Sequence, residues 1–169
     1  WLNQDNAKVE QYLNQSIATD GLGNNDHFDS LVLVAQLQLQ DERYQDALAT
    51  IERVLQEGGS TDPVHVGIKG NALYRLERPA EAIAVLKPLV DAGTADDTVV
   101  QLLAAAYGDA GQSAEAAKLL EQVAAKTPGD KQSQMNLAVN YMQSGQEAQA
   151  AAILEKLRAS GELTEDRDY

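Results

Sequence analysis

The fold is decided by residues 97–128, which read DTVVQLLAAAYGDAGQSAEAAKLLEQVAAKTP. Within this stretch, apolar residues recur three and four positions apart over 97–109 and again over 113–126, as on a helix with one buried face. Two small residues, Ala104 and Ala116, stand where two antiparallel helices would cross closely. The stretch therefore predicts a helix, a short turn and a second helix.

The same unit recurs along most of the chain at a spacing of 34 or 35 residues. The small residue of the second helix recurs at Ala47, Ala82, Ala116 and Ala150, and that of the first helix at Ala35, Gly70, Ala104 and Ala138. A fixed period of this length is the signature of stacked structural repeats. We therefore expect helices over 29–40, 44–57, 63–76, 79–91, 97–109, 113–126, 131–143 and 147–160, with Asp62 and Asp96 as N-caps.

The units resemble the tetratricopeptide repeat (TPR), whose pattern is W-x2-L-G-x2-Y, then A-x3-F, then P over about 34 residues. The third unit matches at Leu103-Ala104, Tyr107, Ala116, Leu120 and Pro128, and the fourth at Leu137-Ala138, Tyr141, Ala150 and Leu154. The first two units depart from the pattern, with Gln38 and Leu73 at the Tyr position and Lys69 at the Leu position. The resemblance implies an all-α fold: a right-handed superhelical α-solenoid of four helix-turn-helix units plus an N-terminal orphan helix.

The repeats predict a single domain over residues 1–169. Its units are expected at 28–61, 63–96, 97–130 and 131–164. Residues 5–19 carry apolar residues at the spacing of a second-helix face and predict the second helix of a preceding, truncated repeat; residues 165–169 predict the start of a truncated following segment. We expect both ends to have been cut from a longer array, because repeat arrays need polar caps and none is recognisable here.

Composition restricts the function. The 169 residues hold 26 Asp and Glu against 13 Lys and Arg, a net charge of -13, which disfavours binding to nucleic acid or to anionic lipid. The chain has no Cys, only two His, and no apolar run long enough to span a membrane. No catalytic or metal-binding constellation is visible, so the sequence predicts no enzyme, no cofactor, no metal site and no membrane insertion.

The resemblance implies that the first helix of each unit lines the concave side of the array. The stripe opposite the crossing face covers 24 positions, of which three are charged, seven are Asn or Gln and eleven are apolar. The stripe has neither Lys nor Arg at the positions where chaperone-tail binders of this family grip a carboxylate. The predicted partner-binding residues are Val32, Gln36, Leu39, Gly67, Asn71, Tyr74, Gln101, Ala105, Met135, Val139 and Met142.

Two functions remain open on this reading. The first is a protein-protein interaction scaffold that binds a partner peptide or helix in this apolar, amide-rich groove. The second is a self-association module that dimerises through open repeat ends or through the groove. An alternative reading of the groove residues is that some of them pack against the neighbouring first helix.

A finer resemblance bears on location. The stretches DGLGNNDHF (20–28), AQLQLQ (35–40) and LTEDRDY (163–169) are similar to segments of secreted bacterial repeat proteins that are described as components of TonB energy-transduction systems. This resemblance implies the bacterial periplasm and an envelope-complex partner, with the cytoplasm as the alternative location. It assigns no functional residue.

Overall fold

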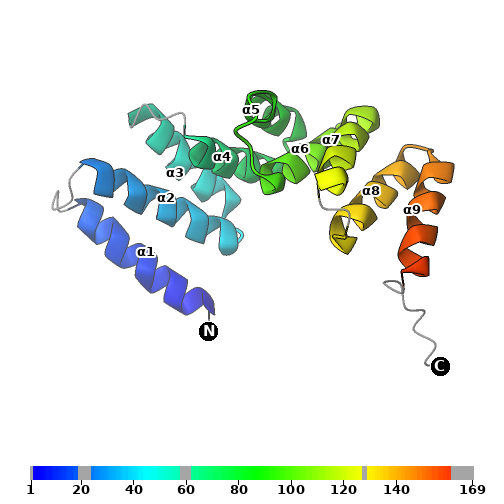
Figure 1. Ribbon diagram of the computed structural model, residues 1–169. Helices are drawn as coiled ribbons and strands as arrows, with labels where there is room; N and C mark the ends of the chain where they lie inside the picture. The colour runs from blue at the N-terminus through cyan, green and yellow to red at the C-terminus, as the bar shows by residue number, and fades with distance from the viewer. Residues whose placement is uncertain (1, 19–23, 58–61, 127–128, 161–169) are drawn as a thin grey trace. The chain divides into compact units, whose positions relative to one another are not determined.

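The computed structural model describes residues 2–18, 24–57, 62–126 and 129–160. Over these residues the secondary structure is helical throughout: α1 (Leu2–Ala18), α2 (Asn24–Gln40), α3 (Tyr44–Glu57), α4 (Pro63–Arg75), α5 (Pro79–Asp91), α6 (Asp97–Asp109), α7 (Ser113–Lys126), α8 (Lys131–Gln143) and α9 (Glu147–Ala159) (Figure 1). Consecutive helices pack against one another from α1 to α5 and from α6 to α9, as in a TPR solenoid. The predicted all-α solenoid class is confirmed.

The chain divides into two compact units, Trp1–Thr94 with α1 to α5 and Ala95–Tyr169 with α6 to α9. In the first unit, Val34, Ile51 and Leu73 are almost fully buried between the paired helices, and Leu103 has the same place in the second. The single continuous domain stays a prediction. The predicted segment at 165–169 lies outside the described residues.

The helix starts follow from capping residues. The carboxylate of Asp62 accepts a hydrogen bond from the backbone N–H of Val64 at 2.8 Å, with Pro63 at the first helical position, and Asp96 accepts one from Val99 at 2.8 Å. Asp130 caps α8 in the same way through Gln132 and Ser133. The two N-caps expected from the sequence, Asp62 and Asp96, are confirmed.

The turn inside each repeat is closed by one recurring backbone hydrogen bond. The amide that follows the turn donates to a carbonyl five residues earlier: Arg43 to Gln38, Arg78 to Leu73, Gln112 to Tyr107 and Gln146 to Tyr141, at 2.7–3.0 Å. The residue before each of these amides has a positive φ. In the two turns of the first compact unit this residue is a glutamate, Glu42 and Glu77, and in the two turns of the second it is a glycine, Gly111 and Gly145. Glycine adopts this conformation without steric cost, whereas a glutamate does not.

Two predicted boundaries differ from the structure. The helix expected over 29–40 begins at Asn24, and the N-terminal helix expected over 5–19 begins at Leu2. The added turn of α2 places Phe28 against the buried cluster formed by Leu31, Ala35 and their neighbours. Tertiary packing of this aromatic ring therefore favours helix before residue 29, where the sequence predicted none.

Candidate functional site

All the residues predicted to bind a partner lie on the first helices of the repeats. Their positions are Val32, Gln36 and Leu39 on α2; Gly67, Asn71 and Tyr74 on α4; Gln101 and Ala105 on α6; Met135, Val139 and Met142 on α8. The first two groups belong to the first unit and the last two to the second. The candidate site is therefore two surfaces, the α2–α4 face and the α6–α8 face. Their role in binding stays a prediction.

On the α2–α4 face the apolar residues are largely used by the fold. Val32 and Leu39 are partly buried and pack against the core cluster that contains Ile51 and Ile68. Gly67 is buried, while Asn71 and Tyr74 are half-buried. Since α2 contacts α4 directly, each first helix covers part of its neighbour. This is the packing alternative that the sequence left open, and it applies to Val32 and Leu39.

On the α6–α8 face large apolar side chains reach the surface. Val139 is 45% exposed and Met142 is 59% exposed, while Met135 is half-buried one turn earlier on the same side of α8. On α6, Ala105 is exposed and Gln101 is half-buried. The eleven predicted residues of both faces include no charged side chain. Exposed apolar surface of this kind marks interaction sites in soluble proteins.

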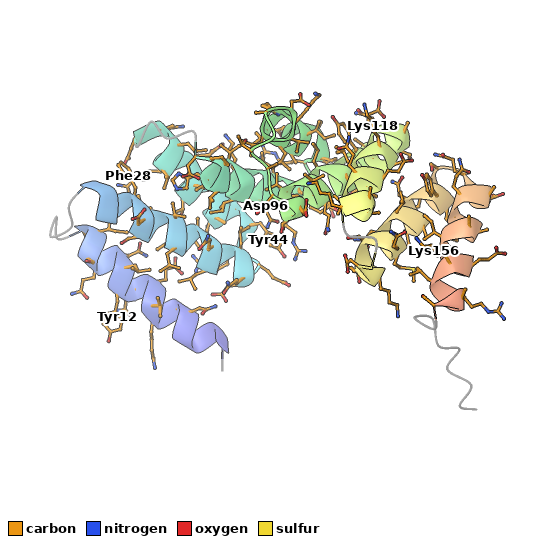
Figure 2. The ribbon with its side chains drawn as sticks, in the orientation of Figure 1. Tyr12, Phe28, Tyr44, Asp96, Lys118 and Lys156 are labelled. Atoms are coloured by element: carbon orange, nitrogen blue, oxygen red, sulfur yellow. The ribbon has the colours of Figure 1, made fainter. Side chains whose placement is uncertain are left out.

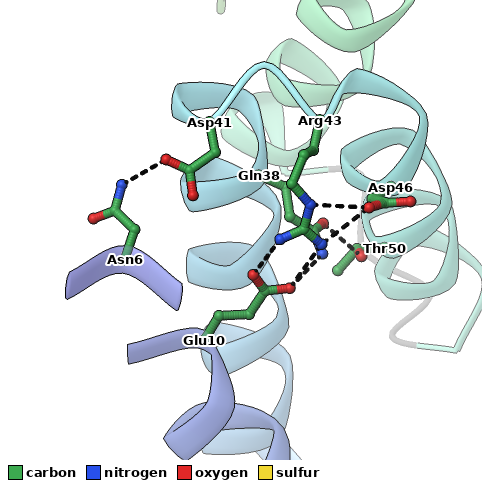
Figure 3. Close-up of polar contacts among 7 residues, drawn as sticks. All are labelled: Asn6, Glu10, Gln38, Asp41, Arg43, Asp46 and Thr50. Atoms are coloured by element: carbon green, nitrogen blue, oxygen red, sulfur yellow. Dashed lines mark hydrogen bonds and ion pairs between the residues drawn. The ribbon is translucent and has the colours of Figure 1, made fainter. Parts of the chain in front are cut away.

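A buried polar network fixes α1 on the first repeat (Figure 3). Glu10 is only 8% exposed, and its carboxylate accepts hydrogen bonds from Gln38 Nε2 at 2.8 Å and from Arg43 Nη1 at 2.6 Å. Arg43 also donates to Asp46 from Nε at 3.0 Å. The hydrogen bond to Glu10 is the main cause that raises the pKa of Arg43 above its usual value. The guanidinium therefore stays charged and links α1 to α3, while Gln38 links Glu10 to α2.

Further hydrogen bonds extend this network on both sides. The amide oxygen of Gln38 accepts from Thr50 Oγ1 at 2.9 Å, and Asn6 Nδ2 donates to Asp41 Oδ1 at 3.0 Å. The sequence signal for the network was Gln38 itself, a polar residue at the Tyr position of the repeat. Its partner Glu10 carries no such signal, because no repeat pattern links residues 28 positions apart. Sequence reasoning missed the network for that reason.

The second unit also carries a pocket away from the predicted residues. It has a volume of about 450 Å³ and is lined by residues of α7, α8 and α9, among them three alanines and Lys156. The Tyr141 hydroxyl donates to the Glu121 carboxylate in this pocket. Burial, and then this hydrogen bond, raise the pKa of Tyr141 to about 12. The pair is a structural link between α8 and α7 at physiological pH.

Apart from the pair of Arg43 and Glu10, several ion pairs of the described residues lie at the surface. Arg78 with Glu81, Lys87 with Asp91, and Lys126 with Asp97 lie on exposed helix surfaces or helix ends. In the described ranges, no three His, Cys, Asp or Glu side chains come together as a metal site would require. None of the described helices is long and apolar enough to cross a membrane.

Helix-turn-helix pairs that recur every 34 or 35 residues and pack consecutively are the architecture of a tetratricopeptide-repeat protein. The family model for the N-terminal TPR repeats region of Psidin matches residues 38–162 of this chain, which is well over half of it. The chain belongs to this family of TPR repeat proteins. No match was found among curated proteins. TPR folds generally serve as non-catalytic scaffolds, and TPR proteins typically bind protein or peptide partners.

Solved structures show the same architecture. The chain is similar to the nearly identical TPR-like repeats of a kinesin-light-chain-type protein from Podosopora anserina, with 26% identity and a TM-score of 0.75 over 92% of this chain and 88% of that one. It is similar to a MamA RS-1 double mutant at 19% identity and a TM-score of 0.81, over 96% and 88% of the two chains. YrrB, described as a TPR protein with an unusual peptide-binding site, has 18% identity and a TM-score of 0.74, over 90% and 76%.

Proposed function

We propose that this protein is a non-enzymatic scaffold that binds a segment of a partner protein on the exposed faces of its first helices. The observation that carries the proposal is the α6–α8 face, where Val139 and Met142 expose apolar side chains without a charge among the predicted residues around them. Apolar anchors surrounded by amides suit a peptide that buries a few side chains while its backbone is hydrogen-bonded. YrrB, a structural neighbour, is described as having a peptide-binding site, which supports this reading.

The charge of the chain adds a property of the partner. The net charge of -13 gives the exterior a negative potential that attracts and steers positively charged proteins. The partner is therefore proposed to carry positive charge outside an uncharged contact segment. The similarity to secreted bacterial repeat proteins supports an envelope complex of the TonB type in the periplasm as its setting.

The test is a pull-down from a bacterial envelope extract with the wild-type chain, the double variant Asn71→Ala, Tyr74→Ala on the α2–α4 face, and the double variant Val139→Ala, Met142→Ala on the α6–α8 face. A control, Asn14→Ala with Gln45→Ala, changes two exposed side chains on α1 and α3, outside both faces. Helicity and light scattering establish that all four proteins are folded and of equal mass. We expect a protein that is retained by the wild type and by the control and lost from the Val139, Met142 variant. Equal retention by all four would refute the proposal.

Self-association is the second candidate, and one observation favours it. On α1, Val9 is 43% exposed and Tyr12 is 71% exposed, so this helix presents an apolar face to solvent (Figure 2). A second copy of the chain covering this face would bury it. Light scattering over a range of concentrations separates the two functions. A dimer that Tyr12→Ala dissociates supports self-association, whereas a concentration-independent monomer contradicts it.

A further inference from the structure

The pocket lined by α7, α8 and α9 is a second candidate binding site, separate from the first-helix faces. Its volume is about 450 Å³, which lies in the range of pockets that hold small molecules in other proteins. Its lining includes Ala124 and Ala125 on α7 and Ala152 on α9. None of the residues predicted to contact a protein partner lines it. A ligand in this pocket would therefore leave both first-helix faces uncovered.

The equivalent place in the first unit carries larger side chains. Leu55 and Gln56 on α3 have the repeat positions that Ala124 and Ala125 have on α7, two repeats later. Leu55 is half-buried there, so its side chain is part of the packing of the first unit. The two alanines of the second unit leave free the space that a leucine and a glutamine would occupy.

The two units also differ in how they neutralise an acid at one repeat position. In the first unit, Lys69 Nζ lies 2.9 Å from the carboxylate of Glu52. Two repeats later the same positions hold Leu137 and Glu121, so an apolar side chain replaces the cation. In the part of the chain that the structure describes, Glu121 accepts a hydrogen bond from the Tyr141 hydroxyl and forms no ion pair. Its negative charge therefore lacks the internal counter-ion that Glu52 has.

A cation lines the same pocket from α9. This cation is Lys156, which stands where the second repeat has Pro88. No carboxylate of residues 2–18, 24–57, 62–126 or 129–160 forms an ion pair with it. Burial is the main cause that raises the pKa of Tyr141 to about 12, so the end of the pocket next to Glu121 is shielded from water. Charges attract one another more strongly where water is excluded.

We propose that this pocket binds a small zwitterion whose ammonium and carboxylate groups are joined by a short apolar chain. The ammonium pairs with Glu121, the carboxylate pairs with Lys156, and the chain lies on the alanines and Leu137. A simple amine would leave Lys156 without a partner. A simple anion would be repelled by the net charge of -13, whereas a zwitterion has no net charge. The class of ligand is therefore an ω-amino carboxylate, and this function goes beyond that of a protein scaffold.

The probes are 4-aminobutanoate, 6-aminohexanoate and 8-aminooctanoate, which differ in the distance between their two charges. Each is titrated into the full chain labelled with ¹⁵N. We expect the amide signals of Ala124, Ala125 and Ala152 to shift, with a Kd of about 1 mM for the best of the three, as suits a ligand of about ten non-hydrogen atoms. The alkyl carboxylate and the alkylamine of the same chain length should each bind about five-fold more weakly, the effect of one solvent-exposed ion pair. No saturable shift with any of the three, or equal affinity for a singly charged analogue, overturns the proposal.

Two variants that remove one charge each test which residue holds which end of the ligand. Glu121→Gln keeps an oxygen that can accept from the Tyr141 hydroxyl, and it should remove only the preference for the zwitterion over the alkyl carboxylate. Lys156→Gln should remove only the preference over the alkylamine. Lys118→Gln changes an exposed lysine of α7 outside the pocket and should bind like wild type. Variants that reduce both preferences equally, or neither, overturn the proposal.

Filling the pocket should also weaken binding. Ala124→Leu installs the residue that the first unit has at this position, and Ala125→Leu fills the pocket from an exposed position that the fold leaves unconstrained. Each should bind the best of the three zwitterions about ten-fold more weakly or worse, because the ligand must compete with the added side chain. Ala151→Leu, at an exposed position of α9 outside the pocket, is the matched control. Helicity establishes that the variants fold, and unchanged binding by a folded variant of either pocket alanine overturns the proposal.

Discussion

Gly70 should be irreplaceable at the crossing of α4 and α5. A Cβ atom built on Gly70 would lie 2.2 Å from Leu86 Cδ2, 2.5 Å from Cγ and 3.0 Å from Cδ1. Leu86 is 0% exposed, so its side chain has no free space into which it can turn. The helices must therefore separate by about 1 Å to restore normal contacts. Gly70→Ala thus overpacks the core of the first unit.

The expected cost of Gly70→Ala follows from two opposing effects. Severe overpacking costs about 3 kcal/mol, whereas alanine gains about 1 kcal/mol over glycine inside a helix. The net loss is about 2 kcal/mol, a substantial part of the about 5–15 kcal/mol that stabilises a typical domain. In urea, followed by helicity, this loss should lower the unfolding midpoint by about 1 M.

A double-mutant cycle with Leu86→Ala tests the cause. Leu86→Ala alone should cost about 2–5 kcal/mol, because it leaves a cavity at a fully buried position. In the double variant the new methyl group occupies part of that cavity. The double variant should therefore lose at least about 1 kcal/mol less stability than the sum of the losses in the two single variants. Strict additivity, or a Gly70→Ala protein as stable as wild type, would refute the packing argument.

Three further predictions concern the turns, the polar network and one tyrosine. Glu42→Gly and Glu77→Gly should each stabilise the first unit by up to about 1 kcal/mol, since both glutamates have positive φ; urea unfolding measures this, and a loss of stability would contradict it. Glu10→Ala removes the carboxylate that accepts a hydrogen bond from the Gln38 amide. It should lower the hydrogen-exchange protection of α1 by about 1–2 kcal/mol, while the protection of α5, which serves as the control, stays the same. The folded pKa of Tyr141, about 12, lies above the value of about 10 for an unfolded tyrosine, so its contribution to stability is complete below pH 10 and is lost as the pH rises towards 12. An ultraviolet difference titration against Tyr141→Phe should show this late transition, and a normal tyrosine transition would contradict it.

The helices and their pairing could be predicted because they depend on local and periodic signals. Small residues such as Ala104 and Ala116 recur in phase, and carboxylates such as Asp62 stand one residue before a helix. These signals lie within a few residues of the structure that they specify. The start of α2 was missed because Phe28 acts through a tertiary contact with the core cluster, which outweighs the polar residues before it.

The sequence could predict which helices carry the candidate site, but not how exposed each of its side chains is. Helical periodicity placed the predicted residues on first helices, yet it treats each repeat as if it stood alone. Contact between α2 and α4 partly buries Leu39, whereas Met142, the equivalent residue on α8, is 59% exposed. Equivalent positions in the repeat therefore differ in availability, and only the neighbouring helix decides which of them a partner can reach.

Two of the glycines inside helices, Gly70 and Gly108, differ in how far packing explains them. At Gly70 the neighbouring Leu86 excludes any side chain, so the fold alone accounts for the residue. At Gly108 an alanine would fit, so the fold does not account for the residue and its cost in helix stability has no structural return. The neighbouring Asn140 adds a second cost by burying an unpaired oxygen. Gly108 and Asn140 are therefore positions where the packing of α6 and α8 does not account for the residue present.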